Sequence, residues 1–520
     1  MPPELADAFS RLPDYLGGHA AVSVTALAIG IAISLPLAFA SLRRPALRGV
    51  LLGAASVVQT IPGLALLALF YPLLLGLAAL SERIFGAGFS ALGFLPSVLA
   101  LTLYSMLPVL RNTVAGLQGI PPAIREAALG VGMTRRQSLF MVEIPLALPV
   151  IMAGIRTAAI WVIGAATLST PIGQTSLGNY IFTGLQTQNW VFVLFGCAAA
   201  AIFALIVDQL LALMEAGLAR RRRGLVATGA LGLALVMAAA LAPGLSRPAA
   251  TYVIGTKPFT EQYVLASLIE QRLRAAGLSA ATRDGLGSAV IFDALRAGDI
   301  DVYVDYTGTL WTGVMKRTGI KPRAEMLAET KAWLAREQGI DLVGGLGFEN
   351  AYAILMRRDH AEALGVRSLA DLAAHAPQLS IAGDYEFFGR PEWNAVRTAY
   401  GLTFREQRQM QPEFMYAAVA SGEVDAIAGY TSDGRIAELK LTVLADPKQA
   451  IPPYDAVLLV SPRRATDAAL HTALKPLIDR ISLAAMQQAN WRAANGANAS
   501  PAQAAAWLWS EIKREKPAPR

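Results

Sequence analysis

Four tyrosines in the second half of the chain lie in or beside short apolar runs that favour β-strands. They are Tyr306, Tyr352, Tyr430 and Tyr454. A quaternary ammonium group cannot donate an ordinary N–H hydrogen bond, but the negative faces of aromatic rings attract it, each by roughly 0.5–2 kcal/mol when desolvated. Together the four rings could form a cage for a methylated cation, whereas any one tyrosine alone is more often an amphipathic residue of a core or its rim.

Three further side chains could bind a carboxylate at the other end of such a ligand. They are Lys257, Thr309 and Arg390. The guanidinium of Arg390 offers a planar fork, Lys257 would add a second cation, and Thr309 would add a hydroxyl. Taken singly, each of the two cations is more often a solvated surface charge. A cage combined with an anion site would suit a betaine.

The elements that must position these side chains alternate between short apolar runs and longer amphipathic ones. We expect strands at 251–256, 301–304, 352–356 and 425–428, and helices at 261–276, 368–375 and 393–400. This alternation predicts an α/β architecture in which helices cover the sheets. The length of the region suits two lobes that close by a hinge on a ligand between them.

The first half of the chain has the composition of a membrane bundle. About 20 mostly apolar residues suffice to cross a hydrocarbon layer of about 30 Å. Six such runs lie near 20–41, 50–75, 93–115, 147–169, 190–214 and 224–243. The predicted fold class is therefore an all-α membrane bundle of about six transmembrane helices, followed by an α/β two-lobed domain of the periplasmic-binding-protein type.

The charge divides unevenly between the two halves. Residues 1–250 hold 15 Arg, no Lys and 8 acidic residues, whereas residues 251–520 hold 30 basic and 30 acidic residues. A nucleic-acid partner is excluded, because its basic binding face should lie on the water-soluble part. The arginines instead gather after the first, third and fifth runs, the side that the positive-inside rule makes cytoplasmic. The amino terminus and residues 251–520 are then predicted to be extracytoplasmic.

The segment 116–146, between the third and fourth runs, predicts a short helix, a bend and a second helix. Pro121 and Pro122 can open the first helix, Glu126 lies near its start, and Gly132 allows a sharp turn. Such an elbow on the cytoplasmic face could seat in a cleft of another protein. From these residues alone, an amphipathic helix lying in the membrane interface explains the segment equally well.

Several kinds of chemistry are excluded by the residues available. No G-x-x-x-x-G-K-[ST] pattern that could cradle nucleotide phosphates occurs. The four histidines are scattered and show no spacing to a nucleophile, and the single Cys197 permits neither an intrachain disulfide nor a cysteine metal cluster. We therefore predict no catalytic residue, no metal site, no cofactor bound by this chain and no enzymatic activity.

The elbow resembles a known docking element. Glu126, Ala127 and Ala128, followed by Gly132 and later by Ile144-Pro145, resemble the EAA loop of ABC-importer permeases, whose short helices dock on ATPase subunits. The phrases at 59–62, 149–157 and 172–178 are similar to those of permeases for glycine betaine, carnitine and choline. This resemblance covers most of residues 20–215. It implies a separate ATPase chain that hydrolyses ATP, and a permease homodimer or a pairing with a close relative.

The second half resembles the binding proteins of the same quaternary-amine importers. The phrases that carry this resemblance lie at 255–262, 301–309, 347–353, 386–390 and 452–454. It implies that the four tyrosines form the cage and that Lys257, Thr309 and Arg390 bind the anionic group. Glu349 stands where the family commonly has Asn, and a carboxylate facing the cage would favour a more cationic ligand such as choline. Related binding domains also accept ergothioneine.

These features combine into one expected organisation. A permease domain should span 1–218, an arginine cluster with a sixth transmembrane anchor 219–248, and a substrate-binding domain 251–520, with lobe 1 at 251–348 and 450–520 and lobe 2 at 349–449. The expected function is ATP-driven import of a quaternary-ammonium compound across the cell membrane, in contact with lipid and an ATPase subunit. Ergothioneine import and a membrane-tethered receptor that does not transport are the alternatives, and the sixth run could also be a cleaved relic of a signal sequence.

Overall fold

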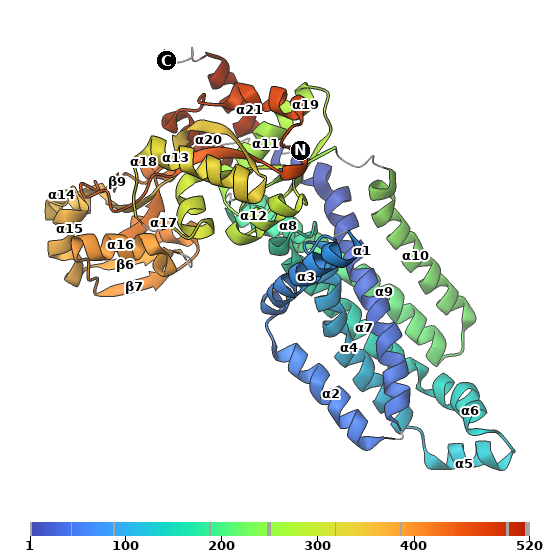
Figure 1. The fold of residues 1–520 in the computed structure, drawn as a ribbon. Helices are drawn as coiled ribbons and strands as arrows, with labels where there is room; N and C mark the ends of the chain where they lie inside the picture. Colours follow the sequence, from blue (N-terminus) through green and yellow to red (C-terminus); the bar gives the residue numbers. More distant parts are fainter. Residues whose placement is uncertain are drawn as a thin grey trace. The chain divides into compact units, whose positions relative to one another are not determined.

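The computed structural model describes residues 3–42, 44–86, 89–186, 189–246, 251–317, 319–384, 387–495 and 499–514. The chain divides into two compact units. One consists of Met1–Phe182 and Val191–Ala249, and the other of Thr183–Trp190 and Ala250–Arg520. We call them the helical unit and the α/β unit, because both β-sheets lie in the second (Figure 1).

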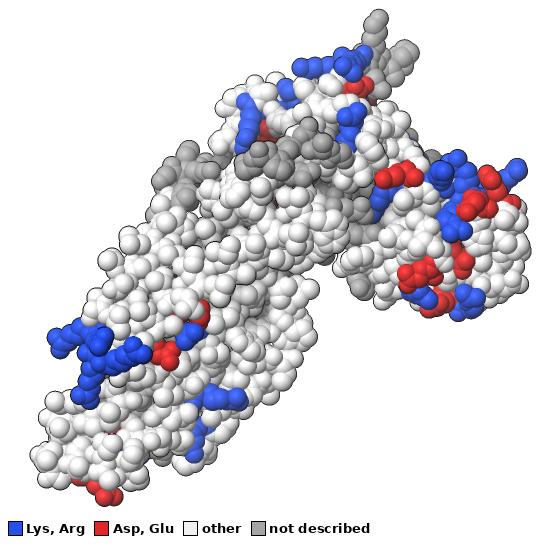
Figure 2. All heavy atoms as spheres, turned by 180° about the vertical axis from the view of Figure 1, so that it is seen from behind, with Lys and Arg blue, Asp and Glu red and all other residues white. Residues whose placement is uncertain are grey.

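The helical unit is built from long apolar helices. They are α1 (Pro3–Ser41), α2 (Pro45–Thr60), α3 (Gly63–Phe85), α4 (Phe94–Gln118), α7 (Ile144–Ala166), α9 (Trp190–Ala219) and α10 (Arg223–Ser246), with the short α5 (Pro122–Gly130) and α6 (Arg135–Ser138) between α4 and α7. Within the described residues, six helical stretches are long and apolar enough to cross a membrane. On the face drawn in Figure 2, charged side chains are sparse over this unit and denser over the α/β unit.

The predicted second span at 50–75 is wrong. The structure breaks this run into α2 and α3, and the helix long enough to cross a membrane is Gly63–Phe85. Ile61 is extended, with φ −73° and ψ 126°, because the ring of Pro62 disfavours a helical conformation at the residue before it. The hydroxyl of Tyr104 donates a hydrogen bond to the carbonyl oxygen that Ile61 presents at the break. A count of apolar residues does not register such a break.

Close contacts and ion pairs hold the helices of this unit together. A Cβ atom added at Gly154 of α7 would lie 2.8 Å from the carbonyl oxygen of Pro108 in α4, so only glycine allows this approach. Arg156, also on α7, forms ion pairs with Asp208 and Glu215 of α9. The charge of Arg156 within these apolar helices is therefore partnered by protein carboxylates, as a low-dielectric surrounding requires.

The α/β unit contains two five-stranded sheets. The first has the order β2-β1-β3-β10-β4 and the second β7-β6-β8-β5-β9. The strands are β1 (Tyr252–Gly255), β2 (Ala280–Arg283), β3 (Val302–Tyr306), β4 (Asp341–Glu349), β5 (Tyr352–Arg357), β6 (Ser380–Gly383), β7 (Glu406–Gln409), β8 (Ala426–Tyr430), β9 (Leu441–Val443) and β10 (Asp455–Val460). The chain passes from the first sheet to the second after β4 and returns before β10, so each lobe has its own sheet.

Helices cover both sheets, as the alternating pattern predicts. They are α11 (Thr260–Ala275), α12 (Ser288–Ala297), α13 (Arg323–Trp333), α14 (Arg358–Leu364), α15 (Leu369–His375), α16 (Pro391–Tyr400), α17 (Pro412–Ser421), α18 (Arg435–Glu438), α19 (Ala468–Leu474), α20 (Leu483–Ala494) and α21 (Pro501–Arg514). The expected strands β1, β3, β5 and β8 and the expected helices α11, α15 and α16 are confirmed. β10 runs antiparallel to both β3 and β4, so the returning chain completes the first sheet.

Candidate functional site

The α/β unit contains a cavity of about 290 Å³. Its lining includes all seven residues predicted to bind a ligand: Lys257, Tyr306, Thr309, Tyr352, Arg390, Tyr430 and Tyr454. Tyr306 ends β3 of the first sheet and Tyr454 directly precedes β10, whereas Tyr352 begins β5 of the second sheet and Tyr430 ends β8. Strand ends of both lobes thus bring together side chains that lie far apart in the sequence.

Three of the tyrosine rings pack around one another. Tyr352 and Tyr430 are directly opposite on the antiparallel strands β5 and β8, and their ring centroids are 5.0 Å apart at an interplanar angle of 38°. The ring of Tyr454 meets that of Tyr352 edge-on, at 5.8 Å and 89°. This arrangement turns ring faces in different directions along one wall of the cavity, which is the geometry that surrounds a cation with negative π faces.

Three of the four tyrosine hydroxyls donate hydrogen bonds to carboxylates. Tyr306 donates to Glu261, Tyr430 to Asp384 and Tyr454 to Glu392. Burial and the neighbouring charges raise the pKa of Tyr306, Tyr430 and Tyr454 well above 10, so the three phenols remain protonated donors at neutral pH. None of these three acids was predicted from the sequence to be a site residue.

Glu261 lies in the first turn of α11 and is only 2% exposed. One carboxylate oxygen accepts hydrogen bonds from Tyr306 at 2.5 Å and from Asn350 at 3.2 Å, and the other accepts one from Asn490 at 3.1 Å. Burial raises the pKa of Glu261 above its ordinary value, and these donors oppose that shift by favouring the charged form.

The shifted pKa of Glu261 predicts a dependence of stability on pH. Because the folded-state pKa lies above the ordinary value of 4.5, this group stabilises the fold most at low pH and loses that contribution as the pH rises through the folded-state pKa. The unfolding free energy of the unchanged chain, minus that of Glu261→Gln, should therefore fall as the pH rises above about 4.5. Urea unfolding followed by tryptophan fluorescence measures it, and parallel pH profiles for the two proteins would contradict the assignment.

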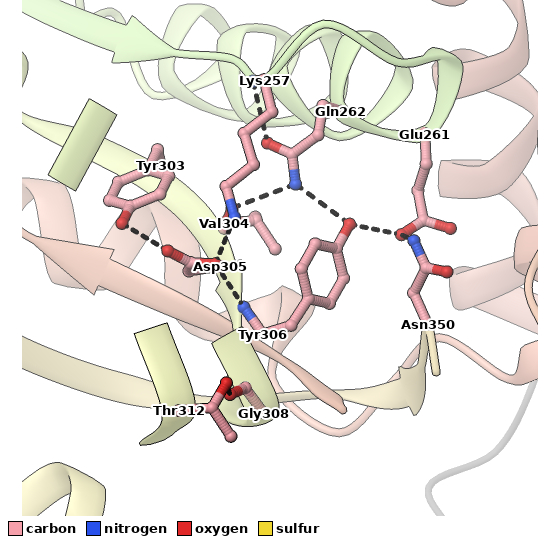
Figure 3. A network of polar contacts seen from close by, with 10 residues as sticks. All are labelled: Lys257, Glu261, Gln262, Tyr303, Val304, Asp305, Tyr306, Gly308, Thr312 and Asn350. Carbon is pink, nitrogen blue, oxygen red and sulfur yellow. Dashed lines mark hydrogen bonds and ion pairs between the residues drawn. The ribbon is translucent and has the colours of Figure 1, made fainter. Parts of the chain in front are cut away.

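Lys257 lines the cavity, but its charge is already partnered. Its ammonium forms an ion pair with Asp305, and both side chains are buried (Figure 3). Asp305 also accepts hydrogen bonds from the hydroxyl of Tyr303 at 2.6 Å and from the backbone N–H of Tyr306 at 2.8 Å. The Lys257 nitrogen lies 5.4 Å from the ring centroid of Tyr306, so this ion pair lies beside one of the rings that line the cavity. No pattern in the sequence indicated Asp305 as the partner.

Arg390 and Thr309 lie on the same cavity. Arg390 lies directly before the start of α16. Its guanidinium carbon is 5.6 Å from the ring centroid of Tyr352. Thr309 is buried at 7% exposure, just after β3. A fork donor and a hydroxyl are thus available beside the aromatic rings, the combination expected for a ligand that carries both a cation and a carboxylate.

Glu349 does not face the cavity, contrary to the possibility raised by its place in the sequence. Its carboxylate forms an ion pair with Arg323 at 2.7 Å, and the neighbouring Asn350 lines the cavity instead. Glu386, part of one of the phrases that resemble the binding proteins, lies outside the described residues. Across the described part of the chain, no group of three or more His, Cys, Asp or Glu side chains could hold a metal ion.

The segment between α4 and α7 forms the predicted helix, bend and helix. α5 ends at Gly130, Gly132 has φ 86°, and α6 begins at Arg135. Arg125 forms an ion pair with Glu143 at 3.0 Å, which ties α5 to the start of α7. Ala128 packs inward, whereas Glu126, Ala127 and Gly132 are exposed.

Exposed apolar side chains surround these three residues. Leu129, Val131, Phe140 and Met141 are 47%, 75%, 62% and 64% exposed, respectively. The bend therefore presents a mixed surface of apolar side chains, the acidic Glu126 and the basic Arg135 and Arg136.

Two protein families match the two halves of the chain. Residues 250–511 match the substrate binding domain of the ABC-type glycine betaine transport system. Residues 30–224 match the binding-protein-dependent transport system inner membrane component. The cavity with its tyrosines lies in the first of these matches, and the bend between α5 and α6 lies in the second.

Named relatives match one or both halves. The ergothioneine transport permease/ergothioneine binding protein EgtU of Helicobacter pylori (strain G27) is 29% identical over 429 residues, which are 79% of this chain and 74% of the relative. The glycine betaine/carnitine/choline transport system permease protein OpuCB of Bacillus subtilis (strain 168) is 40% identical over 199 residues, 38% of this chain and 84% of the relative. The choline transport system permease protein OpuBB of the same strain is 38% identical over 197 residues, 38% of this chain and 83% of the relative. With its six apolar helices and its binding domain, this membrane protein belongs to the quaternary-amine family of ABC importers, as a permease and a substrate-binding domain joined in one polypeptide.

Proposed function

We propose that this chain captures a trimethylammonium compound outside the cell and imports it, driven by ATP hydrolysis on a separate ATPase subunit. The observation that carries the proposal is the convergence of four tyrosines with Arg390 on one cavity of the α/β unit. Aromatic faces attract the methylated cation, and the guanidinium fork binds a carboxylate. Glycine betaine and carnitine have both groups, whereas choline has only the cation.

Ergothioneine is the second candidate substrate. It too is a trimethylated amine with a carboxylate, so the same cage and the same arginine would bind it. What favours it is the similarity to the Helicobacter pylori relative, which extends over 79% of this chain and therefore over both units. Direct titration of the protein with glycine betaine, choline, carnitine and ergothioneine separates the candidates.

The partners follow from the charges and the exposed bend. Arg220–Arg223, which run from the end of α9 to the first residue of α10, are exposed and would lie on the cytoplasmic side, so the amino terminus and the α/β unit would lie outside. The ATPase subunit would dock on Glu126, Ala127, Ala128 and Gly132. Leu69, Leu73, Leu77 and Leu80 along α3 are each more than half exposed, and they would contact lipid or a second permease copy in a homodimer.

Transport in reconstituted vesicles tests the proposal. We expect labelled substrate to accumulate only when the ATPase subunit and ATP are both present. A receptor that closes on its ligand without transporting it would bind substrate and accumulate none. Full uptake in the absence of nucleotide would overturn the ATP-driven mechanism.

Removal of one cage ring should weaken binding in a measurable way. Tyr306→Ala or Tyr454→Ala is expected to cost roughly 1–2 kcal/mol of binding free energy, about tenfold in affinity, because one π face is lost. Calorimetry measures this loss, and thermal unfolding confirms that the variant is folded. Tyr400→Ala is the matched control, because Tyr400 is a buried tyrosine of α16 that does not line the cavity. Unchanged affinity in both cage variants would exclude the cage.

A further inference from the structure

The pairing of tyrosines with acids recurs three times around the cavity. Tyr306, Tyr430 and Tyr454 each donate a hydrogen bond to a carboxylate that is 45, 46 and 62 residues away in the sequence. The three acceptors are nearly inaccessible to solvent: Glu261 is 2% exposed, Asp384 8% and Glu392 2%. We call these three residues the backing carboxylates. Sequence proximity cannot explain the recurrence, since each pair joins separate elements of the fold.

A backing carboxylate acts on a bound cation in two ways. It places a negative charge beside the ligand, directly from the cavity lining for Glu261 and Asp384 and through Tyr454 for Glu392, in a surrounding where low dielectric strengthens the attraction. It also polarises the phenol that donates to it, because a charge-assisted hydrogen bond moves electron density toward the ring and makes its face more negative. Both effects require a full positive charge on the ligand. A neutral ligand of the same shape gains from neither.

Neutral hydrogen-bond donors hold two of the backing carboxylates. Within the part of the chain that the structure describes, neither Glu261 nor Glu392 forms an ion pair with Lys or Arg. One oxygen of Glu392 accepts hydrogen bonds from Tyr454 and from Thr312, the latter at 2.7 Å. The other oxygen is buried and has no hydrogen-bond partner among the described residues. Their negative potential is therefore available to a cation in the cavity.

The pair of Tyr454 and Glu392 also joins the two lobes. Tyr454 directly precedes β10 of the first sheet, whereas Glu392 lies in the first turn of α16, which belongs to the second lobe. A rotation that opened the lobes would therefore move Glu392 away from Tyr454. This carboxylate would strengthen the cage at the moment of capture.

On the basis of the proposed function, we infer that Glu261, Asp384 and Glu392 make the cavity selective for a full positive charge over a neutral group of equal shape. Arg390 would distinguish ligands by their carboxylate. The backing carboxylates would distinguish them by the charge on the methylated centre. The two kinds of selectivity rest on different residues and can be measured separately.

A pair of matched ligands tests this inference on the full-length protein in lipid nanodiscs. Choline has a quaternary nitrogen, and 3,3-dimethyl-1-butanol has a carbon atom in its place. Asp384→Asn and Glu392→Gln keep the size and an acceptor oxygen but remove the charge. In each variant we expect choline affinity to fall about tenfold while the affinity for the neutral alcohol stays unchanged, because only the cation interacts with the lost charge.

The control and the third variant separate charge from structure. Asp301→Asn removes a buried carboxylate that bonds the backbone N–H of Val253 and pairs with Arg464, away from the cavity lining, so neither ligand should be affected. Glu261→Gln provides a third measurement on a pair, Tyr306 and Glu261, whose two members belong to the same lobe. If the variants weaken both ligands equally, the carboxylates only maintain structure and the inference is wrong. Unchanged choline affinity in all three variants would also refute it.

Failure of the inference is distinguishable from failure of the proposed function. The unchanged protein is first titrated with glycine betaine, choline, carnitine and ergothioneine. If it binds none of them, the proposed function fails and the inference fails with it. If it binds choline or another cation but the variants keep their preference for charge, only the role of the backing carboxylates is refuted.

Discussion

Replacing Arg390 with alanine is expected to weaken glycine betaine binding by about 2 kcal/mol, roughly thirtyfold, and to leave choline binding nearly unchanged. The reason is that Arg390 lies on the cavity as a fork donor, and only the betaine has a carboxylate for it to bind. Calorimetric titration of both ligands measures the two losses side by side.

Arg390→Lys is the informative companion variant. It retains the positive charge near Tyr352 but loses the planar fork, so it should leave choline binding unchanged and restore betaine binding only in part. Equal losses for the two ligands in Arg390→Ala would mean that the guanidinium supports the ring of Tyr352 and does not bind the carboxylate.

Charge reversal at Glu126 is expected to reduce substrate-stimulated ATP hydrolysis by tenfold or more, while ligand affinity stays unchanged. Glu126 is exposed on α5, next to the exposed apolar side chains of the bend, so Glu126→Lys places an opposite charge at the surface assigned to ATPase docking. ATPase activity of the reconstituted complex, measured with and without substrate, checks the first effect. Calorimetry on the same protein checks the second.

A matched charge reversal shows whether the effect is local. Glu362→Lys changes an exposed acid of α14 in the α/β unit, and it should preserve coupling. If Glu126→Lys also leaves stimulated hydrolysis intact, the docking role of the bend is wrong.

Much of the fold could be predicted because its periodicities are strong. Apolar runs of sufficient length revealed the membrane helices, and the alternation of strands and helices revealed the α/β unit. The break between α2 and α3 was not predicted, because a hydropathy count considers composition only. The break arises from the effect of Pro62 on the backbone of Ile61. Polar edge strands such as β7, with the sequence Glu406–Gln409, also gave no apolar signal.

The cavity residues could be predicted better than their partners. The tyrosines, Arg390 and Thr309 were recognisable by type and by their place at strand ends, and the structure gathers them on one cavity. The acids that accept the tyrosine hydroxyls, and Asp305 beside Lys257, could not be found in this way, because each pairing depends on how distant segments pack. A signal existed for Glu261 and Asp305, which lie within the phrases at 255–262 and 301–309 that resemble the binding proteins.

The connection between the two units is short, since α10 ends at Ser246 and β1 begins at Tyr252. A tether of this length holds a domain near its permease at an effective concentration of about a millimolar. Delivery is then a first-order event within one molecule, independent of how much free receptor the compartment contains. The uptake rate should therefore saturate as a function of the solute concentration alone. The ratio of one capture domain per permease chain is fixed by translation of a single polypeptide and does not depend on a binding equilibrium.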